Sequence, residues 1–406
     1  MRESAHKFSQ KVLGEAGVRL ASTGFILLLA RHLGAENFGR YSSAFAFASI
    51  AVIFVDLGTN AILTREIARD PSQKGHLASA SHLLKIAAAL GAWLILAAAT
   101  VVLKFRPEQR FLTLCLAVVV IGQTLTDYFS ALLNGIEEMG WEAVLKSLCR
   151  VLSLSLGFIA LALRQPLPVI VACMASGSIA GYGLAVWIVR LRFRTFGLRF
   201  DKAFLRSLMQ SSAPLLASTS FLILYDSQDI LLLNYFHFPQ KSIGWFSAAM
   251  KIVDVLRVYP VLIMSVFFPT LSKLYVTDLP AFKLKQRRLM VFVTGTLCLL
   301  AGALYLLSPW MIGVIYKSDF APASGFLRLL LPALVLLGIN FIQSQMLIAL
   351  NQERKLLSGA ILACAVNLVL ACLFLPRWGV PGTCYAFFGS EIIFFLYLRK
   401  ELSKAV

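Results

Sequence analysis

One stretch near the start of the chain ends an apolar run, turns and starts a second apolar run: Leu27-Leu28-Leu29-Ala30-Arg31-His32-Leu33-Gly34-Ala35-Glu36-Asn37-Phe38-Gly39-Arg40-Tyr41-Ser42-Ser43-Ala44. Apolar segments of about 20 residues, enough to span a bilayer as a helix, flank this turn and recur along the whole chain. Of the 406 residues, 59% are hydrophobic and only 14% are charged, whereas soluble domains are about 25% charged. The sequence therefore predicts an all-α, polytopic membrane protein.

We expect about twelve transmembrane helices, with boundaries that are uncertain by a few residues. They are predicted at residues 9–33, 40–63, 78–103, 110–134, 142–163, 167–190, 205–236, 243–268, 287–308, 323–350, 355–375 and 380–398. Pro214 and Pro260 fall inside the seventh and eighth of these, where proline removes a backbone hydrogen bond and kinks the helix. No cleavable signal peptide is expected, because the first apolar run is of full length.

The opening stretch has a counterpart half a chain later: Leu231-Leu232-Leu233-Asn234-Tyr235-Phe236-His237-Phe238-Pro239-Gln240-Lys241-Ser242-Ile243-Gly244-Trp245-Phe246-Ser247-Ala248-Ala249. Both copies end an apolar run, turn, and restart with glycine, an aromatic residue and small residues. Six helices in each half give the repeats the same orientation, related by a pseudo-twofold axis along the membrane normal. We predict two six-helix lobes, residues 1–195 and 196–406.

The net charge of +18 is explained by topology rather than by nucleic acid, since basic residues concentrate in cytoplasmic loops and meet anionic membrane lipids. With the N-terminus inside, the inner segments carry more than twice as many Lys and Arg residues as the outer ones. Both termini are predicted to be cytoplasmic. The seven cysteines form no metal-ligand spacing, and no nucleotide-binding or hydrolase motif is present. We therefore expect no enzyme activity, catalytic residue, metal site or cofactor.

Ionisable residues inside membrane helices are costly and usually face water or the protein interior. One hypothesis is a hydrophilic cavity in which basic groups bind an anionic head group and acids couple transport to H⁺ or Na⁺. Its basic residues would be Arg19, Lys251 and Arg257, and its acids Glu15, Asp127, Asp226, Asp229 and Asp254. The alternative is that Glu15–Arg19 and Asp254 with Lys251 and Arg257 are internal ion pairs that fix packing.

Four further polar residues within the spans have simpler interpretations. Lys85 lies near the cytoplasmic end of its predicted helix, so we expect it to extend its ammonium to the interface. Asp56 is expected to cap or bind a neighbouring backbone. Glu391 and Asn367 are expected to form hydrogen bonds between helices.

The motif Leu29–Ser42, followed by Asp56-Leu57-Gly58 and Thr64-Arg65-Glu66-Ile67-Ala68-Arg69, resembles the oligosaccharide flippase (O-antigen and polysaccharide export) family. That family belongs to the multidrug/oligosaccharidyl-lipid/polysaccharide exporter superfamily. The remainder of the chain agrees with it in length, helix number and two-lobed repeat.

The resemblance implies a flippase that moves an undecaprenyl-pyrophosphate-linked oligosaccharide to the outer leaflet of the plasma (inner) membrane. Its lobes would alternate between inward-open and outward-open states, coupled to an ion gradient as an antiporter, beside a polysaccharide polymerase. A cation-coupled multidrug exporter of the same superfamily is the main alternative. A membrane-embedded glycan ligase or polymerase would need a large outer loop, and all outer loops here are short.

Overall fold

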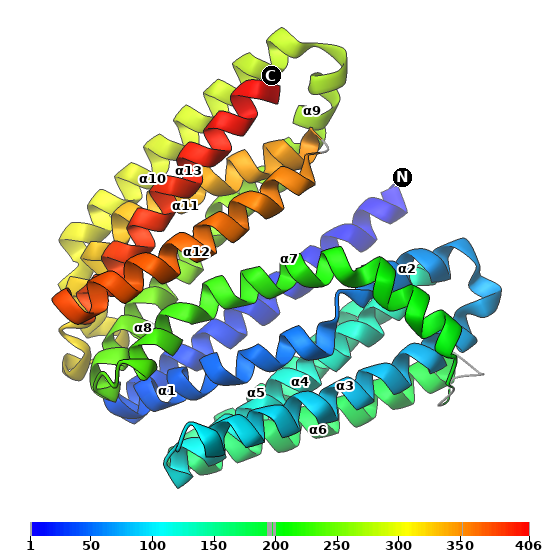
Figure 1. The fold of residues 1–406 in the computed structure, drawn as a ribbon, viewed down its shortest axis with the longest axis horizontal. Coiled ribbons are helices and arrows are strands. Elements are labelled where there is room, and N and C mark those ends of the chain that lie inside the picture. Colours follow the sequence, from blue (N-terminus) through cyan, green and yellow to red (C-terminus); the bar gives the residue numbers. More distant parts are fainter. Residues whose placement is uncertain (1, 193–196, 198–199, 351, 406) are drawn as a thin grey trace. The chain divides into compact units, whose positions relative to one another are not determined.

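The computed structural model describes residues 2–192, 197, 200–350 and 352–405, and in this part of the chain it contains helices but no strand (Figure 1). The predicted all-α class is confirmed. The α-helices are α1, Arg2–Asp56; α2, Thr59–Arg69; α3, Lys74–Val102; α4, Pro107–Gly135; α5, Met139–Ala162; α6, Leu167–Arg192; α7, Lys202–Tyr235; α8, Gln240–Leu256; α9, Val258–Thr277; α10, Leu279–Tyr316; α11, Ala323–Ala349; α12, Glu353–Trp378; and α13, Pro381–Ala405. Short 3₁₀ turns occur at Pro71–Gln73 and Ser318–Phe320.

Among the described residues, nine helices are long and apolar enough to cross a membrane, or ten if the two arms of bent α7 form one span. One of the nine, Ala21–Arg69, joins two predicted spans across the turn at Gly34. The pair α8 and α9, which divides the predicted span 243–268, is not among them. Counting bent α7 as one crossing, Ala21–Arg69 as two and α8 with α9 as one gives the expected number, about twelve. The chain is therefore a multi-pass membrane protein.

The chain divides into two compact units. The first contains residues 1–32 and 43–223, and the second contains residues 33–42 and 224–406. The short segment 33–42, which holds the turn of the opening motif, thus belongs to the second unit. The two lobes proposed from the sequence repeat, and the axis relating them, stay predictions.

In the first unit, α4 is the central helix and contacts α2, α3, α5 and α6 (Figure 1). Its buried face includes Tyr128, Phe129 and Leu132, which pack against Leu63 and Ile67 of α2. In the second unit, α11 has the same central role and contacts α8, α9, α10, α12 and α13. Each unit therefore has a central helix that its neighbouring helices shield from lipid. Such a helix can carry polar residues.

The two copies of the sequence repeat cross each other within the second unit. A side chain at Gly39 would overlap the carbonyl oxygen of Gln240, and one at Gly244 would overlap the carbonyl oxygen of Ala35. The two contacts are reciprocal, because Ala35 and Gln240 lie at the same distance before the two glycines. Only residues without a Cβ permit this backbone-to-backbone approach, which explains why glycine recurs at this position of the motif.

The turn predicted at Gly34–Asn37 is confined to one residue. Gly34 has φ 76° and ψ 172°, and the chain is helical on both sides of it. A backbone amide exposed by such a break needs an acceptor. Asp319 supplies one, because its Oδ2 accepts a hydrogen bond from the Ala35 backbone N–H at 2.7 Å. The helix can therefore restart directly after the glycine.

Both predicted proline kinks are found. Helix α7 bends by 54° at Pro214, between the arms Lys202–Ala213 and Leu215–Tyr235. The eighth predicted span divides into α8 and α9 at Arg257, three residues before Pro260. Pro260 has no N–H for the carbonyl four residues earlier, that of Leu256, the last residue of α8. The break exposes Arg257 at the middle of the span.

Candidate functional site

An ion-pair network joins α7 to the junction of α8 and α9 in the second unit. The Arg257 Nη1 atom lies 3.3 Å from Asp226 Oδ1 and 3.4 Å from Asp254 Oδ1. The Lys251 Nζ atom lies 3.0 Å from the other oxygen of Asp254. The Arg257 guanidinium also lies over the Phe387 ring, 5.8 Å from its centroid. Four of the predicted site residues are therefore in one network, in which both basic groups already have carboxylate partners.

Part of this network lies at the surface of the second unit. The Asp226 side chain is 64% exposed and the Arg257 side chain is 26% exposed, although both residues lie inside spans that the sequence predicts at 205–236 and 243–268. A charged side chain facing hydrocarbon at that depth would cost at least about 2.5 kcal/mol. We infer that this surface of the second unit faces a water-filled region rather than lipid.

One helical turn further along α7, Asp229 is buried instead of exposed. The Asn367 side chain of α12 donates a hydrogen bond from Nδ2 to Asp229 Oδ1 at 3.2 Å. The Asn367 Oδ1 atom is buried and has no hydrogen-bond partner among the described residues. On α13, the buried hydroxyl oxygen of Thr383 also lacks one in that part of the chain. Among the predicted acids whose side chains the structure describes, Asp229 is the one that is buried, and it accepts a hydrogen bond from the Asn367 amide.

Glu391 forms a second buried polar group in the same unit. Its carboxylate accepts hydrogen bonds from the Tyr225 hydroxyl and, at 2.7 Å, from Asn340 Nδ2. The Asn340 amide also donates to the Glu391 backbone carbonyl at 3.0 Å. The expected interhelical hydrogen bonds of Glu391 and Asn367 are confirmed, and they link α7, α11, α12 and α13.

Asp127 belongs to the first unit, where it lies on α4. Its Oδ2 is 3.9 Å from Arg150 Nη2 on α5. A small pocket between α4, α5 and α6 is lined by Asp127, Arg150, Lys146 and Ser178, among others. Asp127 therefore has a local cationic neighbour. Glu15 and Arg19 lie outside the residues whose side chains the structure describes, so their roles stay predictions.

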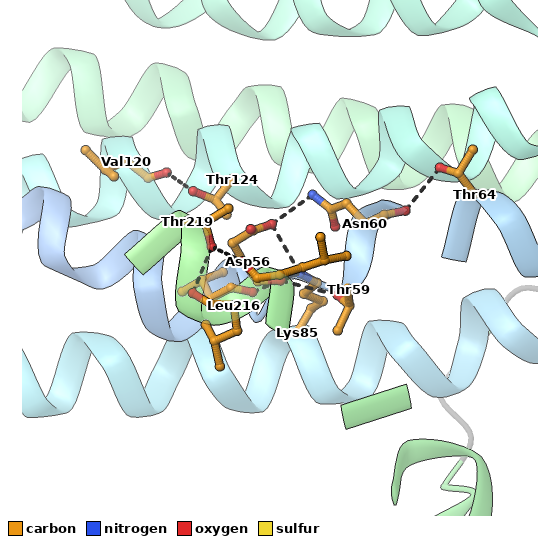
Figure 2. Close-up of polar contacts among 11 residues, drawn as sticks. Asp56, Thr59, Asn60, Thr64, Lys85, Val120, Thr124, Leu216 and Thr219 are labelled. Carbon is orange, nitrogen blue, oxygen red and sulfur yellow. Dashed lines mark hydrogen bonds and ion pairs between the residues drawn. The ribbon is translucent and has the colours of Figure 1, made fainter. Parts of the chain in front are cut away.

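A second polar centre lies in the first unit, where α1 ends at Asp56 and α2 begins at Thr59 (Figure 2). Leu57 and Gly58 have φ values of 53° and 64°, which break the helix inside a predicted span. A side chain at Gly58 would clash with the α7 backbone at Leu215 and Leu216. Glycine therefore serves the break in two ways: it adopts the left-handed conformation and admits α7.

Lys85 of α3 points into this break, and the expectation that it reaches the interface is wrong. Its side chain is fully buried, and Nζ donates to the carbonyl oxygens of Val55 and Asp56. The broken helix lies within reach of the Lys85 ammonium, so the lysine finds acceptors inside the protein and need not reach the membrane surface. The Asp56 carboxylate binds side chains rather than the expected backbone group: it accepts a hydrogen bond from Asn60 Nδ2 and lies 3.9 Å from Lys85 Nζ. The Asp56 backbone carbonyl accepts a hydrogen bond from the Thr59 hydroxyl.

The model of the family described as "Polysaccharide biosynthesis protein" matches residues 6–275, well over half of the chain. The chain belongs to the polysaccharide biosynthesis protein family. The matched segment covers the first unit and reaches the network of Lys251, Asp254 and Arg257.

Members of the wider superfamily resemble the chain over nearly its whole length. It is 22% identical to the probable low-salt glycan biosynthesis flippase Agl15 of Haloferax volcanii, over 99% of this chain and 84% of that protein. The fold matches the lipid II flippase MurJ in an inward closed conformation, with a TM-score of 0.77 and 16% identity, over 97% of this chain and 87% of that one. It also matches an inward-facing multidrug resistance MATE transporter of the MOP superfamily, with a TM-score of 0.72 and 16% identity, covering 96% and 95%.

The comparisons thus show a membrane protein of the polysaccharide biosynthesis protein family that shares its fold with a lipid flippase and a multidrug transporter. Sequence reasoning underestimated two groups: the Lys85–Asp56 contact, for which the Asp-Leu-Gly sequence was a signal, and the partner of Glu391. Asn340 carries no signal of its own, because a lone amide in an apolar helix has many possible partners.

Proposed function

We propose that the chain moves an undecaprenyl-pyrophosphate-linked oligosaccharide from the cytoplasmic to the outer leaflet by alternating access. The head group would bind at Lys251 and Arg257. The observation that carries the proposal is the ion-pair network of Lys251, Asp254, Arg257 and Asp226 on an exposed surface at mid-span.

Pyrophosphate suits this network chemically. Arginine forms paired hydrogen bonds to phosphate oxygens, and lysine adds a compact positive charge. In the substrate-free state Asp226 and Asp254 would neutralise the two basic groups, so the transporter can return without unpaired charge. A pyrophosphate would replace these carboxylates as the partner of Arg257 and Lys251. Arg19 is proposed as a further basic contact from the first helix.

We propose that Asp229 carries the coupling cation, H⁺ or Na⁺, in an antiport cycle. It is a carboxylate that is only 5% exposed, and among the described residues its side-chain hydrogen bond is to an amide, with no basic group within ion-pair distance. The Asn367 side chain that bonds to Asp229 also carries a buried Oδ1 atom without a partner among the described residues, an oxygen of the kind that hard cations prefer. Glu15, Asp127, Asp226 and Asp254 stay candidates for additional acidic groups on the transport path.

We further propose that the chain lies in the plasma (inner) membrane with both termini in the cytoplasm, beside a polysaccharide polymerase. The asymmetric distribution of Lys and Arg supports this orientation.

Deletion and complementation test the transport proposal. A strain lacking the gene should accumulate lipid-linked oligosaccharide in the inner leaflet, measured by protection of the lipid-linked glycan from an externally added glycosidase. Variants R257A and K251A should restore transport at least tenfold less well than the wild-type chain, since a charge-assisted hydrogen bond contributes about 1.5–3 kcal/mol. R288A, which removes an exposed arginine of α10, is the matched control and should complement fully.

The same strains address the multidrug alternative, which the exposed carboxylates Asp226 and Asp254 favour because they suit organic cations. If the deletion strain gained sensitivity to lipophilic cations and accumulated no lipid-linked glycan, the flippase proposal would be wrong.

The coupling proposal has its own variant, D229N. It should remove the dependence of glycan transport on the Na⁺ or H⁺ gradient, because the neutral amide neither titrates nor attracts a cation. The quantity to measure is transport in membrane vesicles with and without an imposed gradient of each ion. S218A on α7, a change to a hydroxyl that bonds its own helix, should keep the wild-type dependence. An unchanged gradient dependence in D229N would remove Asp229 from the coupling step.

A further inference from the structure

The break between α1 and α2 gathers oxygen atoms at one point in the first unit. Helix α1 ends at Asp56 because the chain takes a left-handed conformation at Leu57 and Gly58, and the Asp56 carbonyl accepts a hydrogen bond from the Thr59 hydroxyl at 3.3 Å. The Asp56 carboxylate lies on the same side, held by Asn60 Nδ2 at 3.0 Å from Oδ1. The buried Asn60 Oδ1 has no hydrogen-bond partner among the described residues. The break therefore brings backbone carbonyls and the Asp56 carboxylate together at one place, beside Lys85 (Figure 2).

The Lys85 side chain brings an ammonium group to these oxygens. Its Nζ donates to the Val55 carbonyl at 2.9 Å and to the Asp56 carbonyl, and it lies 3.9 Å from Asp56 Oδ1. The two carbonyl oxygens accept hydrogen bonds from Nζ, and the carboxylate oxygen lies at ion-pair distance, so each of these neighbours of Nζ is an oxygen that favours a positive charge. The Tyr128 ring face, 5.7 Å away, also favours a cation.

The arrangement has the chemistry of an alkali-cation site. In transporters with interrupted helices, carbonyls at the unwound end of a half-helix bind coupling cations. Here the negative end of the α1 dipole and the Asp56 carboxylate both favour positive charge. A side chain of this protein supplies that charge.

We propose that the α1–α2 break is a monovalent-cation site whose occupant is the tethered ammonium of Lys85. The first unit then needs no free cation at the α1–α2 break. This site is distinct from the cation site proposed at Asp229 in the second unit. When the tether is removed, the site accepts a small free cation such as NH₄⁺, methylammonium, K⁺ or Na⁺. The Asp56 side chain is 19% exposed, which leaves a path for an ion to enter.

Two substitutions of Lys85 distinguish a cation site from a packing role. Lys85→Ala removes the ammonium and the stem, which leaves room for an ion. Lys85→Met removes the ammonium but keeps a side chain of similar length in the same space. Both variants lose the tether, but only K85A is expected to take up a free cation.

The experiment is thermal unfolding of the purified full-length chain and its variants in chlorides of each cation, with N-methylglucamine chloride at equal ionic strength as the reference. K85A should show a saturable rise in the unfolding midpoint, on the order of a few degrees, in at least one small-cation salt. The wild-type chain and K85M should respond equally to all salts. The double variant K85A/D56N should lose the response of K85A.

Two results would overturn the proposal. One is a K85A midpoint that depends on the cation no more than that of K85M. The other is failure to recover folded K85A in any of the cations while K85M is recovered, because a free cation would then be unable to replace the ammonium.

Discussion

At the scale of a single residue, Asp319 connects separate parts of the second unit. Its Oδ2 accepts the Ala35 backbone N–H, and its Oδ1 lies 2.9 Å from Lys241 Nζ. Its backbone carbonyl accepts a hydrogen bond from Trp245 Nε1 at 2.8 Å. The Ala35 hydrogen bond first, and then Lys241, hold the pKa of Asp319 below its usual value. The carboxylate thus caps the helix that restarts after Gly34 and joins it to α8.

Replacing Asp319 by asparagine should lower the unfolding midpoint at neutral pH. A carboxylate whose pKa is lowered in the folded state stabilises that state above its unfolded pKa, about 3.9, and the stabilisation is lost as the pH falls through the lower, folded value. The midpoint difference between wild type and D319N should therefore be constant near neutral pH and shrink below about pH 4.

K241M is the matched comparison for D319N. It removes only a partly exposed ion pair, which contributes about 0–1 kcal/mol, so it should cost less than D319N. A difference between wild type and D319N that stayed constant down to pH 3 would show that the charge of Asp319 does not stabilise the fold.

At the scale of the elements, the reciprocal crossing of Gly39 and Gly244 determines how the two repeat copies meet. Each glycine lies against the backbone of the other copy, at Gln240 and Ala35 respectively. The crossing explains why both copies of the repeat have glycine at this position. The glycines were visible in both copies, but their contact was not predictable, because nothing local indicates that two turns half a chain apart touch.

G39A and G244A should each destabilise the protein by about 1–3 kcal/mol, the usual cost of overpacking. Their effects should not add in the double variant, because both substitutions separate the same two helices. G302A is the control: its added methyl group meets nothing within 4 Å on α10, so alanine should be neutral or slightly stabilising. Chemical or thermal unfolding of the four variants measures this. Additive losses, or losses equal to that of G302A, would contradict the crossing.

The sequence predicts features that depend on neighbouring residues, and it does not predict contacts between residues that are far apart along the chain. Apolar spans and the proline bend at Pro214 are local properties, so they were predictable. The partnership of Asp229 with Asn367 joins residues 138 positions apart, and no local pattern specifies it. The interfacial position predicted for Lys85 is wrong because it depends only on where Lys85 lies along its own helix. The oxygen atoms that accept hydrogen bonds from Lys85 belong to a break in another helix.

At the scale of the whole molecule, the chain shares its fold with a known lipid flippase and a multidrug transporter, and its second unit carries an exposed network of paired charges. The central claim is that this network binds the pyrophosphate of a lipid-linked glycan during transport. Arg257 is its most connected residue, with Asp226 and Asp254 on one nitrogen and Phe387 beneath the guanidinium.

The most direct test is transport by purified protein in proteoliposomes that contain a fluorescent undecaprenyl-pyrophosphate oligosaccharide in one leaflet. The wild-type chain should move the lipid between leaflets, measured as loss of protection from an external quencher. R288A should match it, and R257A should be at least tenfold slower while remaining folded. Equal transport by R257A and wild type, or no transport by the wild-type chain under any imposed ion gradient, would contradict the account.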